Sequence, residues 1–133
     1  MRRLLAFLTL LVLFLSGCAR ERRTPPTGNV LYHRFCASCH GMDGKGDGPV
    51  AVSLRRPPPD LTTLVRRAGG RFDEAEVMAV INGRRVVAEH GPREMPVWGV
   101  VFEEELKDQP YTQYTGLLRS RVLADYLRSI QQE

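Results

Sequence analysis

The most constraining feature of the 133-residue sequence is the segment Cys36-Ala37-Ser38-Cys39-His40. Two cysteines three positions apart, followed at once by a histidine, match the C-x-x-C-H signature of c-type haem attachment. The spacing has a chemical reason. Two thiols add to the two vinyl groups of the porphyrin, and the adjacent imidazole reaches the iron from one face. The motif therefore predicts one covalently attached haem c, bound through Cys36 and Cys39 and ligated axially by His40.

Two other uses of closely spaced cysteines fit the chain less well. A thioredoxin-like C-x-x-C motif gives the histidine no role and belongs to a βαβ context, which the sequence does not indicate. A zinc site needs a second pair of Cys or His ligands at short spacing. Only His33 and His90 remain, and they are far apart in the sequence. Covalent haem is therefore the preferred interpretation.

The N-terminus predicts export. Arg2 and Arg3 precede an apolar run over residues 4–15, which is shorter than the roughly 20 residues of a membrane-spanning helix and is typical of a signal peptide. The following Leu15-Ser16-Gly17-Cys18 resembles the bacterial lipobox. This resemblance implies a lipoprotein signal peptide over 1–17, a lipidated Cys18, and a tether over 18–27. An uncleaved anchor helix and an ordinary signal-peptidase cut are the alternatives.

Charge and cysteine usage narrow the class of protein further. The net charge is +4, but from Thr24 onward 14 Lys/Arg balance 14 Asp/Glu. A nucleic-acid-binding domain is basic over its folded part, so we expect no nucleic-acid partner. Lipid on Cys18 and haem on the other two cysteines would use all three thiols and leave none for a disulfide.

From Gly28 onward the chain resembles the class I c-type cytochromes, in the bacterial single-haem group. Four blocks carry the resemblance, namely Gly28-x-x-Leu31-Tyr32-x-x-x-Cys36, the glycine-rich segment from His40 to Pro49, Met95-Pro96-Val97-Trp98-Gly99, and Asp125-Tyr126-Leu127-Arg128-Ser129-Ile130. The resemblance implies a cytochrome c domain over 28–133. The expected fold is mostly α, with three to five helices and long loops wrapped around one haem. In this family the first and last helices cross, here with Tyr32 or Phe35 against Tyr126 or Leu127.

The resemblance also implies the remaining site residues. Met95 corresponds to the second axial ligand of the iron, and a backbone carbonyl near residues 57–59 accepts a hydrogen bond from the proximal histidine. Met42 follows His40 too closely to reach the opposite haem face, and Met78 lies in a helical pattern that predicts core packing. His90 and an open iron site remain as alternatives to Met95.

The periodicity of the rest of the domain gives a coarse outline. We expect a helix over 28–40 with His33 on its solvated face, a loop over 41–59, and a short helix capped by Asp60. Another helix follows between Asp73 and Gly83. A last helix is expected over 117–131, with an apolar stripe of Leu118, Val122, Leu123, Tyr126, Leu127 and Ile130.

Residues 103–114 are predicted to form a surface loop, and Trp98 is predicted to pack beside the haem. The basic pairs 55–56, 66–67 and 84–85 are expected at the solvated surface, unless one meets the haem propionates or an acidic partner.

These features predict an electron-transfer protein rather than an enzyme. With His40 and Met95 on the iron, no small-molecule substrate binds there. The lipid anchor would hold the domain at the periplasmic side of a bacterial membrane. Its expected partners are a membrane-bound quinol-oxidising complex and an oxidase or reductase of a respiratory or other periplasmic electron-transfer chain.

The alternative function is a haem electron-relay subunit of a periplasmic oxidoreductase. A gas or redox sensor would need an exchangeable ligand on the iron. Because about 105 residues form only a small core, we also expect the haem-free chain to fold poorly.

Overall fold

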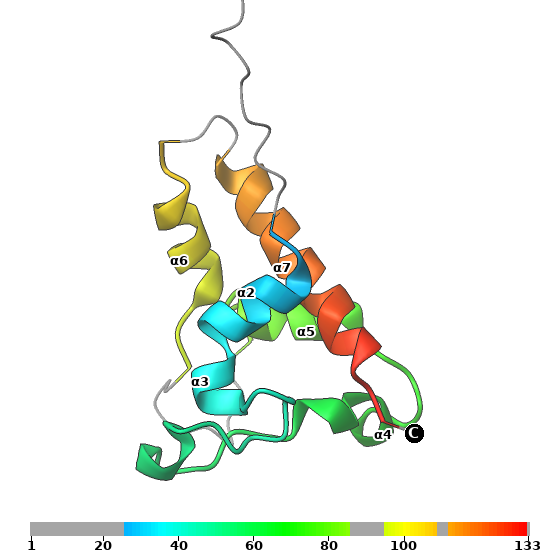
Figure 1. Cartoon of the computed structure of the whole chain (residues 1–133). Helices are drawn as coiled ribbons and strands as arrows, with labels where there is room; N and C mark the ends of the chain where they lie inside the picture. Colours follow the sequence, from blue (N-terminus) through cyan, green and yellow to red (C-terminus); the bar gives the residue numbers. More distant parts are fainter. Residues whose placement is uncertain (1–25, 86–94, 109–111, 133) are drawn as a thin grey trace, which may run out of the picture.

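The computed structural model describes residues 26–85, 95–108 and 112–132, and the labels follow Figure 1. These residues form helices and loops, with no β-strand among them. The elements are α2 (Gly28–Phe35), α3 (Ala37–His40), the 3-10 turns η1 (Ala51–Ser53) and η2 (Leu61–Thr63), α4 (Leu64–Arg67), α5 (Glu74–Ile81), α6 (Trp98–Glu105) and α7 (Thr112–Ser129). The mostly helical fold predicted from the sequence is confirmed. Of the six α-helical segments in the described ranges, α3 and α4 are single turns.

Helices α2 and α7 cross at the centre of the fold (Figure 1). A β-carbon on Gly28 would lie 2.0 Å from the Val122 carbonyl oxygen, so only glycine permits this close approach. The side chain of Tyr32 is fully buried, and its ring lies 5.1 Å from that of Tyr126, centroid to centroid. The predicted crossing of the first and last helices, with Tyr32 against Tyr126, is therefore confirmed.

The first helix is interrupted, which the sequence did not predict. One helix was expected over 28–40, but the backbone departs from helical geometry at Cys36, with φ −115° and ψ −36°. Helix α2 ends before this residue and α3 begins after it. The bend starts a new turn for the second half of the haem motif, and Figure 1 shows that α3 leads down from α2 toward the long loop.

The last helix begins at Thr112 rather than at 117, and its buried face differs from the predicted stripe. Ser120, Leu123, Ala124 and Leu127 are buried, whereas Leu118 is 46% exposed. Position 118 is five residues before Leu123, which places the two roughly 140° apart around the helix axis. Leu118 therefore lies outside the buried face, and the prediction for this residue is wrong.

Part of the expected loop over 103–114 is helical. Helix α6 continues to Glu105, and its buried face presents Phe102, which is fully buried. Residues 109–111 of this stretch lie outside the described residues. The acidic end of α6 was misread because its partners are distant in the sequence. Glu105 pairs with Arg34 of α2 at 3.0 Å and with Arg119 of α7 at 2.8 Å.

Two aspartates begin the short helices as predicted. Asp60 Oδ1 accepts a hydrogen bond from the backbone N–H of Thr62 at 2.8 Å, at the start of η2 and α4. Asp73 Oδ1 accepts one from the N–H of Glu76 at 3.0 Å, at the start of α5. Each carboxylate satisfies an N–H group that has no partner within its own helix. Helix α4 and the loop over 41–59 form the lower part of the molecule in Figure 1, whereas α5 lies at the level of the α2–α7 crossing.

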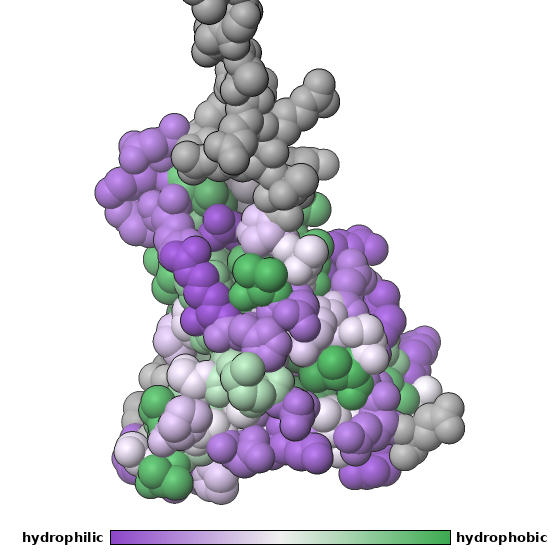
Figure 2. Space-filling view, viewed as in Figure 1, coloured by the Kyte–Doolittle hydropathy of each residue, from purple (hydrophilic) through white to green (hydrophobic). Residues whose placement is uncertain are grey.

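The apolar side chains gather inside rather than on one outer face. Leu31, Tyr32, Ile81, Phe102 and Leu123 belong to one buried cluster, to which α2, α3, α5, α6 and α7 contribute. On the face drawn in Figure 2, apolar residues form separate patches within a largely polar surface. The described residues contain no helix that combines the length and hydropathy needed to cross a bilayer.

Candidate haem site

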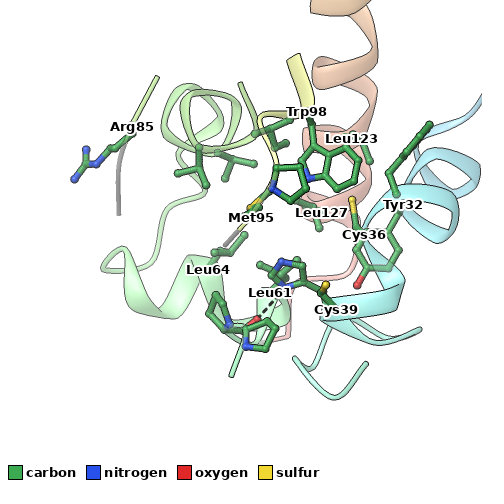
Figure 3. A pocket seen from close by; sticks show the side chains of 18 of the residues that line it. Tyr32, Cys36, Cys39, Leu61, Leu64, Arg85, Met95, Trp98, Leu123 and Leu127 are labelled. Carbon is green, nitrogen blue, oxygen red and sulfur yellow. Dashed lines mark hydrogen bonds between the residues drawn. The ribbon is translucent and has the colours of Figure 1, made fainter. Parts of the chain in front are cut away.

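Helix α3 brings the two cysteines and the histidine of the motif to one cavity. Cys36 immediately precedes this helical turn, and Cys39 and His40 end it. Backbone N–H groups of both Cys39 and His40 donate to the Cys36 carbonyl, at 3.1 and 2.9 Å. The two cysteines are free thiols, and both line the cavity. Figure 3 shows their sulfur atoms on the same side of it.

His40 is buried and held from one side by the chain. Its Nδ1 lies 3.3 Å from the carbonyl oxygen of Pro59, the dashed line in Figure 3. A carbonyl oxygen can only accept, so this contact assigns the proton to Nδ1. The lone pair is then on Nε2, the nitrogen that can bind a metal. The expectation that a carbonyl within 57–59 accepts from this histidine is confirmed.

The loop after the motif is fastened to α3 by its backbone. The N–H groups of Gly46, Gly48 and Val50 donate to carbonyls within residues 38–40, at 2.8 to 3.1 Å. A β-carbon on Gly48 would lie 2.4 Å from the Ser38 carbonyl oxygen. Glycine at this position therefore lets the loop approach the motif closely enough to make these hydrogen bonds.

Tyr32 anchors the same loop from the core. Its hydroxyl donates to the Gly41 carbonyl oxygen at 2.7 Å. Burial raises the pKa of Tyr32 above its ordinary value, and the nearby Cys36 adds to the effect. The hydroxyl therefore remains a donor over the physiological pH range. This contact links the α2–α7 crossing to the residue that directly follows His40.

The cavity itself is about 410 Å³ in volume, within the range of small-molecule and cofactor sites. Its walls come from α2, α3, α4, α5, α7, loop residues within 54–59 and the segment 95–98, and they are mainly apolar. The apolar lining includes Leu61, Leu64, Val77, Ile81, Leu123 and Leu127. A large, flat, apolar group could be kept from water here, with its edge toward the cysteines.

Met95 lies at this cavity, as do the two thiols and His40. It is half-buried, and Figure 3 shows its sulfur near the centre of the drawn site. Trp98 also lines the cavity, as expected for a haem neighbour, and packs against Phe35 with ring centroids 5.5 Å apart. The segment 95–98 thus contributes a thioether and an indole to the same wall.

The other candidate ligands lie elsewhere. Met42 is 65% exposed on the loop, and Met78 is half-buried on α5. His33 was expected on a solvated face, but it is half-buried with its ring edge-on to Tyr32, at 5.6 Å between centroids. The reason is that α2 turns this side toward the core next to Tyr32. His90 and Cys18 fall outside the described residues.

The environment of Cys36 argues against dithiol redox chemistry. Burial raises the pKa of its thiol to about 12, with a further contribution from Cys39. Reactive cysteines of the thioredoxin type have lowered pKa values, because only the thiolate attacks. In the described part of the chain, no three Cys, His, Asp or Glu side chains are grouped to hold a metal ion, so the zinc alternative gains no support.

Four charged side chains complete the lining, namely Arg56, Arg67, Glu76 and Arg85. The sequence raised the possibility that one of the three basic pairs meets an anionic group, and each pair supplies one arginine here. Apolar walls, two thiols, one oriented imidazole, a thioether and guanidinium groups fit an iron porphyrin with carboxylate substituents.

Comparison with known proteins gives one finding. A family model described as Cytochrome c matches residues 26–113. No curated protein and no solved structure matches the chain.

Proposed function

The chain belongs to the cytochrome c family, and from this we propose that it is a membrane-anchored, single-haem electron carrier. Proteins of this family bind covalently attached haem c and use it for electron transfer. The haem supplies one-electron chemistry between ferrous and ferric iron. The observation that carries the proposal is that Cys36, Cys39, His40 and Met95 line the same apolar cavity.

Each of these four residues has a distinct role in the proposal. Cys36 and Cys39 would hold the haem through thioether bonds, in which each sulfur bonds to one vinyl carbon and the thiol hydrogen moves to the other. His40 would hold the iron through Nε2, because its Nδ1–H is directed to Pro59. The sulfur of Met95 would be the second protein ligand of the iron. The soft thioether would favour ferrous iron and raise the reduction potential.

A closed iron favours a carrier over an enzyme. With His40 and Met95 both coordinated, electrons would enter and leave without a substrate on the metal. The apolar walls would keep water from the iron, and the loop fastened to α3 would limit movement of the proximal ligand between oxidation states. Such rigidity keeps the structural change on electron transfer small.

The location and partners follow from the N-terminal sequence. Export, lipidation of Cys18 and a tether to residue 27 would hold the domain at the periplasmic side of a bacterial membrane. A ten-residue tether over 18–27 spans at most about 35 Å. The short reach supports redox partners in the same membrane, such as a quinol-oxidising complex and an oxidase or reductase.

The axial ligands are tested by near-infrared absorption of the oxidised holoprotein. A methionine-to-iron charge-transfer band is expected in the native protein, and it should disappear in Met95→Ala. Met42→Ala and Met78→Ala are matched controls that should keep the band. If the native protein lacks the band, or if Met95→Ala retains it, ligation by Met95 is wrong. Loss of bis-histidine spectral features in His90→Ala, or binding of external ligands to the native iron, would then identify His90 or an open site.

A further inference from the structure

One buried hydroxyl group connects α7 to the end of α5. Ser120 lies within α7 and is fully buried. A serine inside a helix can donate to the carbonyl four positions earlier, and here the Gly116 carbonyl oxygen lies 3.3 Å from Ser120 Oγ. The shorter hydrogen bond, at 2.8 Å, goes instead to Asn82 Oδ1. A hydroxyl has one proton to donate, so Ser120 directs it to the residue that follows α5.

The beginning of α6 packs against the same asparagine. Gly99 is the second residue of α6, and a β-carbon on it would lie 2.8 Å from Asn82 Oδ1 and 3.4 Å from Asn82 Cα. Glycine is a poor helix former, and the close approach accounts for its presence here. The Asn82 side chain is thus in contact with α7 through Ser120 and with α6 at Gly99. We call these three residues the α5–α6–α7 junction.

The junction encloses, along the sequence, the segment that carries Met95. Asn82 precedes Met95 by 13 positions, and Gly99 follows it by four. Only residues 96–98 separate Met95 from the junction, and Pro96 fixes one of the backbone dihedrals between them. A displacement of Gly99 would therefore reach Met95 through a short stretch of chain with limited freedom.

The contacts of Trp98 show that the first turn of α6 is held on two sides. Trp98 precedes Gly99, lines the cavity with Met95 (Figure 3), and has its ring 5.5 Å from that of Phe35. This aromatic contact buries apolar surface but does not fix a single direction. A hydrogen bond does fix a distance and a direction. The junction therefore determines where the segment 95–98 ends relative to the cavity.

We propose that Ser120 and Asn82 are positioning residues for the thioether of Met95, because they hold the start of α6 at the place from which Met95 reaches the cavity. This proposal rests on the proposed ligation of the iron by Met95. Neither side chain lines the described cavity, so both act through Gly99. By limiting the positions open to the Met95 sulfur, the junction favours the thioether over an external ligand.

The test measures how readily imidazole replaces Met95 on the iron of the oxidised holoprotein. Imidazole is titrated without denaturant, and its affinity is measured from the visible spectrum and from loss of the methionine-to-iron band. Ser120→Ala and Asn82→Ala should each raise this affinity about tenfold, because each removes the hydrogen bond of the junction. A purely structural role would lower the resistance to urea and leave the affinity unchanged, since the protein stays folded without denaturant.

Two matched controls alter contacts of the same helices outside the junction. Ser129→Ala removes another hydroxyl of α7, which donates to the Tyr126 carbonyl oxygen at 2.7 Å within the same helix. Glu74→Gln weakens a contact between α5 and α7 at the opposite end of α5, where Glu74 pairs with Arg121 at 3.1 Å. Each control should change the imidazole affinity less than about twofold, because distant contacts contribute independently.

Two further variants test whether the junction acts as one unit. The double variant Ser120→Ala, Asn82→Ala should bind imidazole about as tightly as either single variant, because both substitutions break the same contact. Gly99→Ala should also raise the affinity, although alanine favours helix formation, because its β-carbon would displace Asn82. Gly116→Ala is its control, since the nearest atom to that β-carbon is Cγ of the flexible Glu103 side chain, at 3.3 Å.

Native imidazole affinity in Ser120→Ala, an equal rise in Ser129→Ala, or additive effects in the double variant would overturn the proposal. If Ser120→Ala does not incorporate haem, Gly99→Ala tests the same contact from α6, and native affinity there would equally overturn it. Failure of the proposed ligation is recognised separately, because the native protein would then lack the methionine-to-iron band. A native band together with unchanged imidazole affinity in the junction variants would contradict the positioning role alone.

Discussion

The strongest consequence of the structure is that the haem-free chain should not hold this fold. The perturbation is the double variant Cys36→Ala, Cys39→Ala, which removes both covalent bonds to the haem. The cavity has a volume of about 410 Å³. Unfilled apolar cavities cost about 24 cal/mol for each Å³, which gives about 10 kcal/mol here. That is an upper value, because water can enter the open cavity.

A penalty of this size matches the whole stability of a small domain, which is about 5–15 kcal/mol. The same apolar side chains that line the cavity also pack the core, so a collapsed cavity would disturb the helices as well. We therefore expect the double variant to retain partial helicity without fixed packing of side chains.

The assay combines urea unfolding, followed by circular dichroism, with a two-dimensional amide NMR spectrum of the double variant. Weak dispersion and a broad, non-cooperative transition are expected. Ser38→Ala is the matched control, because it alters an exposed residue of the same motif that makes no bond to haem, and it should behave as the native holoprotein does. A dispersed spectrum with a cooperative free energy of unfolding above about 5 kcal/mol would refute the reasoning.

Three further predictions concern the holoprotein. Tyr32→Phe should lower the free energy of unfolding by about 1–3 kcal/mol, because a buried loop carbonyl loses its donor; urea titration measures this, and an unchanged midpoint would contradict it. Gly48→Ala should reduce the yield of haem-loaded protein, because the added β-carbon would lie 2.4 Å from the Ser38 carbonyl oxygen. Gly69→Ala is the control: its β-carbon would have no atom within 4 Å, so it should cost only about 1–2 kcal/mol of backbone strain. The Thr62 hydroxyl holds the pKa of Asp60 below its ordinary value. The ionised Asp60 carboxylate therefore stabilises the fold above about pH 4, and this contribution is lost as the pH falls further. Asp60→Asn should make the decrease in unfolding free energy with acid shallower, and a pH profile identical to that of the native protein would contradict this assignment.

The parts of the site that were predictable depend on short-range chemistry. The spacing of Cys36, Cys39 and His40 is fixed by the geometry of one helical turn, so five residues were enough to indicate the cofactor. The Pro59 carbonyl could be expected through the family resemblance, since the loop has to return to the histidine ring. Both inferences describe positions where covalent or hydrogen-bond geometry leaves few alternatives.

The parts that were missed depend on contacts between residues distant in the sequence. The acidic end of α6 looked like a loop because Glu105 pairs with arginines 71 positions earlier and 14 positions later. Ser120 is absent from the predicted apolar stripe of α7, but it is buried and donates to Asn82 Oδ1 at 2.8 Å. Periodicity detects apolar faces, so it gives no signal for a buried hydroxyl whose partner ends another helix.

The site and the fold were predicted together because they share side chains. Tyr32, Ile81, Leu123 and Leu127 belong both to the buried cluster and to the cavity wall. A substitution at any of them would change helix packing and haem environment at once, so stability and reduction potential should vary together at these positions. Arg56, Arg67 and Arg85 also line the cavity but are exposed, and exposed guanidinium groups contribute little to packing. Substitutions at these three arginines should therefore leave the α2–α7 crossing intact.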